Sequence, residues 1–129
     1  MKICSRNVNG IRAVLGKGFL DRVKQEQADI ICLQEVKAFE TQIPPEVRFF
    51  LTDYQYLWHR GTRPGYAGTA IFYRKNLEII EKRSDFPIAS FHEDGRVTEL
   101  RFLYQEKEIV LLNFYVPNGN IRADGTEML

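Results

Sequence analysis

Polar side chains stand at three points where a short apolar segment of this chain ends. They are Asn7 with Asn9, Glu35 with Lys37, and Asn113 with Tyr115 and Asn118. If the three segment ends converge in the fold, these groups build one polar site. A carboxylate such as that of Glu35 is a candidate metal ligand, although a single glutamate at the end of a strand is usually a solvated surface residue.

The segments that must position these groups are mostly predicted strands. Residues 30 to 33 (Ile-Ile-Cys-Leu) form a continuous apolar run, which is typical of a strand covered on both faces. Strands are expected at residues 2–7, 30–33, 54–60, 69–74, 77–83, 97–104 and 109–115. Helices are expected at residues 19–27, where apolar positions recur at helical spacing, and from Pro44-Pro45 through Phe50.

This order of elements predicts the class of fold. A strand, a helix, a strand and a helix are followed by several strands, so an α/β protein with a mixed sheet and helices against it is expected, not a barrel or a bundle. Asn9-Gly10 supplies a sharp turn after the first strand, and residues 61–68 are too rich in glycine for regular structure.

Composition leaves the function open but bears on where the protein is located. The 129 residues are 44% hydrophobic, enough for one core, and no apolar run is long enough for a membrane span or a secretory signal. A cytoplasmic protein is therefore expected, with Cys4 and Cys32 as buried thiols. The formal net charge is only +1, so any contact with nucleic acid must come from locally placed Arg and Lys.

Five segments carry a resemblance to the exonuclease III type of abasic-site endonucleases, within the endonuclease/exonuclease/phosphatase superfamily. They are Asn-Val-Asn-Gly-Ile-Arg-Ala at 7 to 13, Leu-Gln-Glu-Val-Lys at 33 to 37, Gly-Tyr-Ala-Gly-Thr-Ala at 65 to 70, Gly-Arg-Val at 95 to 97, and Tyr-Val-Pro-Asn at 115 to 118. Their order and spacing make the resemblance specific. It implies a Mg²⁺-dependent DNA repair nuclease with abasic-site endonuclease and 3′–5′ exodeoxyribonuclease activity.

The resemblance implies catalytic and metal-site roles for three residues. Glu35 matches the glutamate that binds Mg²⁺, for which Mn²⁺ is an alternative, and Asn7 matches an asparagine beside that metal. Tyr115 matches a tyrosine near the scissile phosphate, where its phenol can donate a hydrogen bond to developing negative charge. The alternatives are that Asn7 is a turn residue bonded to its own backbone and Tyr115 a core residue at a strand end.

The resemblance also implies a partner, double-stranded DNA with abasic sites or 3′ ends. Arg12, Lys37, Arg63 and Tyr66 match or neighbour positions that touch the DNA backbone in such enzymes, and phosphate contacts of this kind position DNA without reading its sequence. Each of the four can equally be a solvated surface residue. No membrane partner is expected.

Two departures from the family pattern stand out. Arg6 occupies a position that usually holds an aromatic residue before the asparagine, so its charged head must reach solvent. The chain also ends at Leu129, whereas the family continues for a comparable length with an Asp-x-Asn motif, a further metal-site aspartate and a late Asp-His pair. Residues 1–129 are therefore expected to be the amino-terminal part of one domain, and inactive alone.

The family fold is a four-layer α/β sandwich, of which this chain would supply one half. With one sheet lacking its partner, the strands around Ala70 to Phe72 and Ile109 to Phe114 are expected to expose apolar surface. Self-association of the chain is then expected, while the full-length parent would be monomeric.

Two competing functions remain open from the sequence. Inositol polyphosphate phosphatases, sphingomyelinases and general deoxyribonucleases share the superfamily's glutamate-centred metal site, so another phosphodiesterase or phosphatase is one alternative. A noncatalytic DNA-binding module that keeps Arg12, Lys37, Arg63 and Tyr66 is the other.

Overall fold

The computed structural model describes residues 1–62, 64–87 and 94–117. Its strands are β1 (Ile3–Asn7), β2 (Ile30–Gln34), β3 (Tyr54–His59), β4 (Thr69–Arg74), β5 (Glu78–Arg83), β6 (Val97–Tyr104) and β7 (Lys107–Phe114). Its helices are α1 (Ile11–Val14), η1 (Leu15–Lys17), α2 (Phe19–Glu26), η2 (Glu40–Gln42) and α3 (Pro45–Phe50). Within these residues, no helix is both long and apolar enough to cross a membrane.

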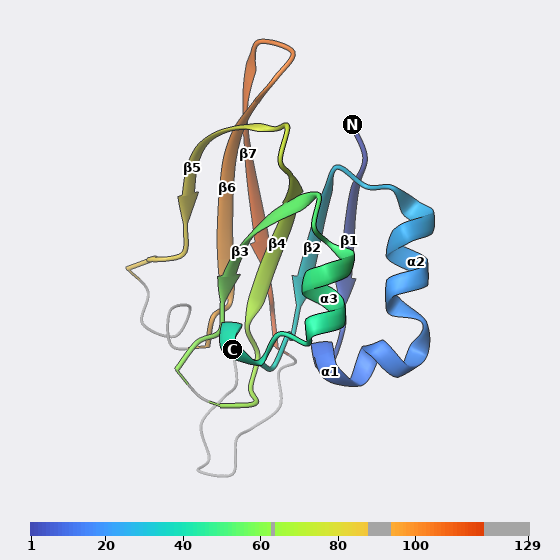
Figure 1. Ribbon diagram of the computed structural model, residues 1–129. Coiled ribbons are helices and arrows are strands. Elements are labelled where there is room, and N and C mark those ends of the chain that lie inside the picture. The colour runs from blue at the N-terminus through green and yellow to red at the C-terminus, as the bar shows by residue number, and fades with distance from the viewer. Residues whose placement is uncertain (63, 88–93, 118–129) are drawn as a thin grey trace.

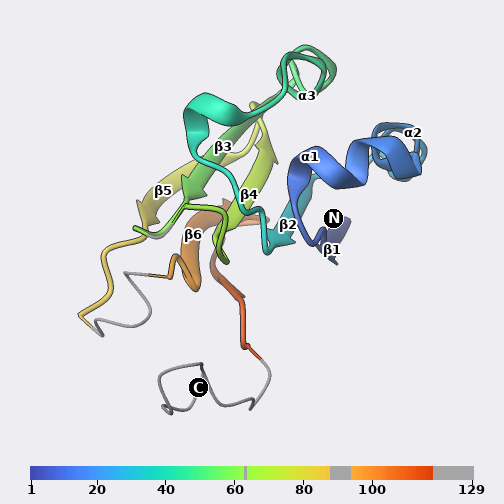
Figure 2. The same cartoon turned by 90° about the horizontal axis from the view of Figure 1, so that it is seen from below.

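The strands form two sheets. The first has the order β1-β2-β4-β3, with β1 parallel to β2 and the other pairs antiparallel. The second is an antiparallel sheet with the order β5-β6-β7. The helices lie over one face of the first sheet and the second sheet lies over its other face, so the chain forms three layers (Figures 1 and 2). The expected α/β fold with helices on the outer face of a mixed sheet is confirmed.

Two apolar clusters hold the layers together. Ile31 and Leu33 of β2 face the helices, whereas Ile30 and Cys32 face the second sheet. Because side chains alternate between the faces of a strand, both faces of β2 are buried, which explains its continuous apolar run. β4 follows the same pattern. The first sheet is thus the central layer of the structure, packed on both of its faces.

The expectation that two strand segments expose apolar surface is wrong for Ala70 to Phe72 and confirmed for Ile109 to Phe114. Ala70, Ile71 and Phe72 are at most 3% exposed, because Leu100 and Phe102 of the second sheet and the helices cover β4. The outward side of β7 is open instead. Val110, Leu112 and Phe114 are 44–48% exposed in one row. The apolar surface left uncovered therefore belongs to the second sheet.

The two cysteines are free thiols, as expected, but only Cys32 is buried and Cys4 is half-buried; they lie on opposite faces of the first sheet. Cys4 packs with the helix-side cluster, and Cys32 lies between the sheets. Burial raises the pKa of the Cys32 thiol to about 12, so it stays protonated at neutral pH. Neither cysteine belongs to the polar residues described next.

Candidate active site

Asn7 and Glu35 meet because β1 and β2 run parallel. Asn7, the last residue of β1, pairs with Gln34, and Glu35 follows directly. The Asn7 side chain donates a hydrogen bond from Nδ2 to Glu35 Oε1 at 3.0 Å, and its Oδ1 accepts one from the Asn9 backbone N–H at 3.0 Å. Asn7 thus bonds the backbone of its own turn, as one alternative predicted, and its amide also contacts the carboxylate of Glu35, the candidate metal ligand.

One cationic residue lies beside the same carboxylate, and a second lies beside the first. The Lys37 ammonium is 3.5 Å from Glu35 Oε2 and donates a hydrogen bond to Asn9 Oδ1. The Arg12 guanidinium reaches the Lys37 carbonyl oxygen at 3.5 Å, a long contact. Of the predicted DNA contacts in this part of the chain, Lys37 therefore lies beside the carboxylate and Arg12 lies beside Lys37, where a phosphate would meet positive charge.

Tyr115 comes to this place from the second sheet. It follows β7, and its backbone N–H donates to the Arg96 carbonyl at 2.7 Å. Burial, the charge of Glu35 and a hydrogen bond to Glu35 together raise the pKa of the Tyr115 phenol to about 12, with Tyr66 adding to the rise and Arg96 opposing it. The phenol is therefore protonated at neutral pH and available as a donor beside Glu35.

Three residues of the site are not glycines yet have left-handed backbone conformations. Asn9, Glu35 and Lys37 have φ values of 46°, 53° and 51°. Asparagine tolerates this region, but for Glu and Lys it costs about 1–2 kcal/mol each. Backbone hydrogen bonds hold the strained segment, from Gly10 N–H to Glu35 O at 2.7 Å and from Lys37 N–H to Ala67 O at 2.8 Å. Strain that is retained in this way is typical of functional sites.

A buried ion pair below Tyr115 was not identified from the sequence. The Arg96 guanidinium contacts Asp94 Oδ2 through Nη2 at 2.6 Å and Nε at 2.9 Å, and both residues are buried. The Asp94 carbonyl accepts a hydrogen bond from the Gly68 N–H. The available signals were a charged pair two residues apart around a glycine and the family resemblance of the Gly-Arg-Val segment at 95 to 97. The pair connects the loop that carries Tyr66 to the strand end that carries Tyr115.

The remaining predicted site residues divide into two groups. Tyr66 is half-buried and close enough to Tyr115 to influence its pKa. Arg63 and Asn118 lie outside the described residues. The structure therefore brings together Asn7, Glu35, Lys37, Tyr66 and Tyr115, with Arg12 beside Lys37; we call this set the polar rim.

The polar rim supplies a partial set of ligands for a divalent cation. Glu35 offers a carboxylate, the donor type that Mg²⁺ prefers, and Mg²⁺ commonly uses one or two carboxylates with several waters. Within residues 1–62, 64–87 and 94–117, no group of three or more His, Cys, Asp or Glu side chains is placed to hold a metal. Glu35 thus fits Mg²⁺ as one ligand of a site that needs others.

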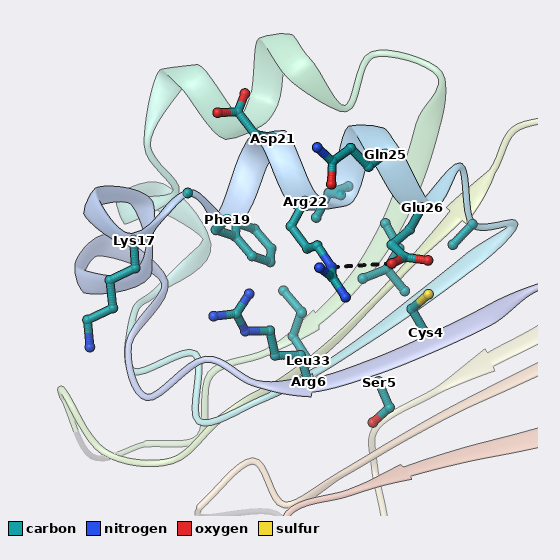
Figure 3. A pocket seen from close by; sticks show the side chains of 14 residues that line it. Cys4, Ser5, Arg6, Lys17, Phe19, Asp21, Arg22, Gln25, Glu26 and Leu33 are labelled. Atoms are coloured by element: carbon teal, nitrogen blue, oxygen red, sulfur yellow. Dashed lines mark ion pairs between the residues drawn. The ribbon is translucent and has the colours of Figure 1, made fainter.

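A cavity of about 740 Å³ lies elsewhere, between β1 and α2 (Figure 3). Arg6, Phe19 and Arg22 are among its lining residues, and no residue of the polar rim is. The exposed head of Arg6 lies over the Phe19 ring, 5.7 Å from its centroid, so the unusual arginine does not bury its charge. The candidate site is consequently an open rim and not this cavity.

The proximity of Tyr115 to Glu35 gives a testable pKa difference. In Glu35→Gln we expect the Tyr115 pKa to fall from about 12 while staying above 10, because the Glu35 effects disappear and burial remains. Because the Tyr115 pKa is raised in the folded state, the bound proton stabilises the fold below pH 10, and this stabilisation is lost as the pH rises through about 12. The variant has a smaller pKa rise and therefore loses less folding stability across that pH range. ¹³C NMR titration of labelled tyrosine measures the pKa, and an unchanged value would show that the two groups do not interact.

The chain matches the model of the "Endonuclease/Exonuclease/phosphatase family" over residues 7–117. It is 36% identical over 121 residues to an exodeoxyribonuclease of Bacillus subtilis, covering 92% of this chain and 44% of the relative. It is 32% identical over 123 residues to a DNA-(apurinic or apyrimidinic site) endonuclease of Dictyostelium discoideum, covering 95% of this chain and 32% of the relative.

A solved structure supports the same relationship. The AP endonuclease LMAP from Leishmania major superposes with a TM-score of 0.68 at 25% identity, covering 93% of this chain and 41% of that one. The described fold is therefore shared with a known nuclease structure. In each of these comparisons the chain spans less than half the length of the similar protein.

Proposed function

The chain belongs to the endonuclease/exonuclease/phosphatase family, and from that premise we propose that it carries the amino-terminal part of the active site of a Mg²⁺-dependent DNA repair nuclease. The proposed reaction is hydrolysis of a phosphodiester bond at abasic sites or 3′ ends of double-stranded DNA. The names of the relatives, an exodeoxyribonuclease and an abasic-site endonuclease, support this substrate.

One observation carries the proposal. Glu35, from the end of a strand in the first sheet, lies against Tyr115, from the end of a strand in the second. Residues so far apart in sequence meet there with Asn7 and Lys37, and the backbone at Glu35 is strained. A purely structural strand end needs neither the strain nor the clustered polar groups.

Each residue of the polar rim has a part in the proposed reaction. Glu35 would hold Mg²⁺, which when bound supplies stabilisation of negative charge on the phosphate. Asn7 fixes the Glu35 carboxylate through its amide N–H. The protonated Tyr115 phenol donates a hydrogen bond toward the charge that develops on phosphate oxygen.

The cationic residues would hold the DNA. Lys37 lies next to the carboxylate and Arg12 lies beside Lys37; Arg12 is exposed and Lys37 half-exposed, so both can contact DNA backbone phosphates. We propose that Tyr66 and Arg63 contact the DNA backbone as well. With a net charge of only +1 on the chain, binding depends on these local contacts.

The full reaction also needs an activated water and a managed leaving group, for which the polar rim has no carboxylate or histidine besides Glu35. We propose that these groups and the other metal ligands come from the part of the family domain that lies beyond this chain. The chain alone is then expected to be inactive or nearly so.

Mixing experiments test this proposal. A duplex with one synthetic abasic site is incubated with Mg²⁺ and the chain, with and without the carboxyl-terminal part of the Bacillus subtilis relative. We expect incision only in the mixture, which we call the reconstituted nuclease, because only there are all the required groups present. Manganese should replace magnesium, and chelation should abolish incision.

The matched control is the mixture made with Glu35→Gln, which should associate equally and incise far less. Incision by the chain alone would show that the rest of the domain is not needed. If the two parts associate without incision, a noncatalytic DNA-binding module is favoured, and preferential hydrolysis of a phosphoinositide would indicate another branch of the superfamily.

A further inference from the structure

Asn113 is a buried polar residue in the apolar layer between the sheets. It lies on β7, is 3% exposed, and neighbours Ile109 and Leu111, which pack against the inter-sheet cluster. A leucine would fill such a place with apolar contacts alone. A buried amide is tolerated only when its hydrogen bonds are satisfied, so its partners indicate what it does.

The amide of Asn113 connects three strands. Its Nδ2 donates to the Leu33 carbonyl of β2 at 3.0 Å and to the Ala70 carbonyl of β4 at 2.9 Å. Its Oδ1 accepts a hydrogen bond from Gln34 Nε2 at 2.7 Å. Both donors and the acceptor are therefore used, all toward the opposite sheet.

These bonds fix how far β7 can slide over the first sheet. Apolar packing between sheets is not directional, so it permits several positions of β7 along the first sheet. The three hydrogen bonds of Asn113, two to backbone carbonyls and one from a side chain, can form in only one of these positions. A slip of one residue along a strand corresponds to about 3.4 Å. A slip of that size would separate the Asn113 amide from its acceptors.

The polar rim begins two residues beyond these bonds on each side. Tyr115 follows Asn113 by two positions, just after the end of β7, and Glu35 follows Leu33 by two positions, just after the end of β2. A displacement at Asn113 is therefore transmitted along short extended segments to the place where Tyr115 and Glu35 meet.

We propose that Asn113, supported by Gln34, is a positioning residue that sets Tyr115 against Glu35 by fixing β7 to β2 and β4. The inference rests on the proposed function for its importance, but the geometry it predicts can be measured without activity. Asn113 itself does not touch the reacting groups; it acts through the strand that carries Tyr115.

The test uses the chain labelled with ¹³Cζ-tyrosine, with the Tyr115 signal assigned by its loss in Tyr115→Phe. In the wild type, Glu35→Gln should shift the Tyr115 signal at neutral pH, because the phenol loses its carboxylate partner. In Asn113→Leu, which is similar in volume, Glu35→Gln should shift the signal by less than half as much, because the two groups are no longer held together.

Thr98→Val is the matched control. Thr98 lies opposite Asn113 on β6, is fully buried, and has a hydroxyl without a hydrogen-bond partner among the described residues. Its replacement disturbs the same layer and should leave the full response to Glu35→Gln. An equal loss in Thr98→Val, or an undiminished response in a folded Asn113→Leu, would overturn the proposal.

If Asn113→Leu does not fold, Gln34→Met decides, because it removes the hydrogen bond to Asn113, together with one to Ser5 Oγ, from a residue nearer the surface. A reduced response supports positioning, and an unchanged one overturns it. In the reconstituted nuclease, Asn113→Leu should lower kcat at least tenfold with little change in KM. If Asn113→Leu reduces the response of the Tyr115 signal to Glu35→Gln as expected, but the wild-type reconstituted nuclease shows no activity, then the positioning role stands and the proposed function fails.

Discussion

Replacement of Tyr115 with phenylalanine is expected to slow incision of an abasic-site duplex by the reconstituted nuclease by about 10²–10³-fold. The phenol, with its pKa raised to about 12, is protonated across the working pH range and donates a hydrogen bond beside Glu35. Phenylalanine keeps the ring and removes this donor. Because we propose that this donor stabilises charge that develops in the transition state, the loss should appear in kcat with KM little changed.

Single-turnover incision with the reconstituted nuclease in saturating excess over the duplex measures this effect directly. Tyr73→Phe is the matched control, since Tyr73 is 2% exposed between the sheets and its hydroxyl lies 3.4 Å from Gln55, away from the polar rim. Its replacement should change the rate by less than twofold. Equal rates for wild type and Tyr115→Phe would remove Tyr115 from the chemistry and leave it a core tyrosine.

Gly95→Ala is expected to lower the free energy of unfolding of the chain by about 3 kcal/mol or more. Gly95 has φ +61°, and a Cβ there would lie 2.5 Å from the His59 carbonyl oxygen and 2.7 Å from the Gly61 nitrogen. Both atoms belong to the backbone, so neither can rotate away. The loop that holds Asp94 and Arg96 would have to move.

Urea unfolding followed by circular dichroism checks this value. Gly16→Ala is the matched control, because a Cβ at Gly16 would meet nothing within 4 Å and its φ is not in the left-handed region. That variant should be neutral or slightly more stable, since alanine reduces the entropy of the unfolded chain. Similar stability of the two variants would mean that the loop at Gly95 adapts freely.

The sequence predicted the strands well because their signals are local. The apolar runs that begin at Ile30 and at Ala70 determine strand positions almost to the residue, and the structure confirms them. The second sheet was not anticipated, because nothing local states that β5, β6 and β7 pair with one another and not with β4. The short helix α1 lacked a helical apolar period long enough to recognise.

For the candidate site too, local motifs could be recognised in the sequence, whereas contacts that form only on folding could not. Asn7, Glu35 and Tyr115 were identified by motif, and the structure places them together. Asn113 was noted only as a polar residue at a strand end, since its three cross-sheet bonds exist only after the layers have packed. Arg96 was likewise missed as a neighbour of Tyr115, because a buried ion pair looks in sequence like two surface charges.

The left-handed backbone at Glu35 and Lys37 has a consequence for how this protein can evolve. Glycine adopts such conformations without steric cost, so at these two positions the side chains that serve the site oppose the backbone that carries them. Selection for thermal stability alone would favour glycine at these positions, whereas selection for the proposed nuclease function would keep glutamate and lysine. A laboratory lineage evolved only for heat resistance is therefore expected to lose the polar rim first at these two positions.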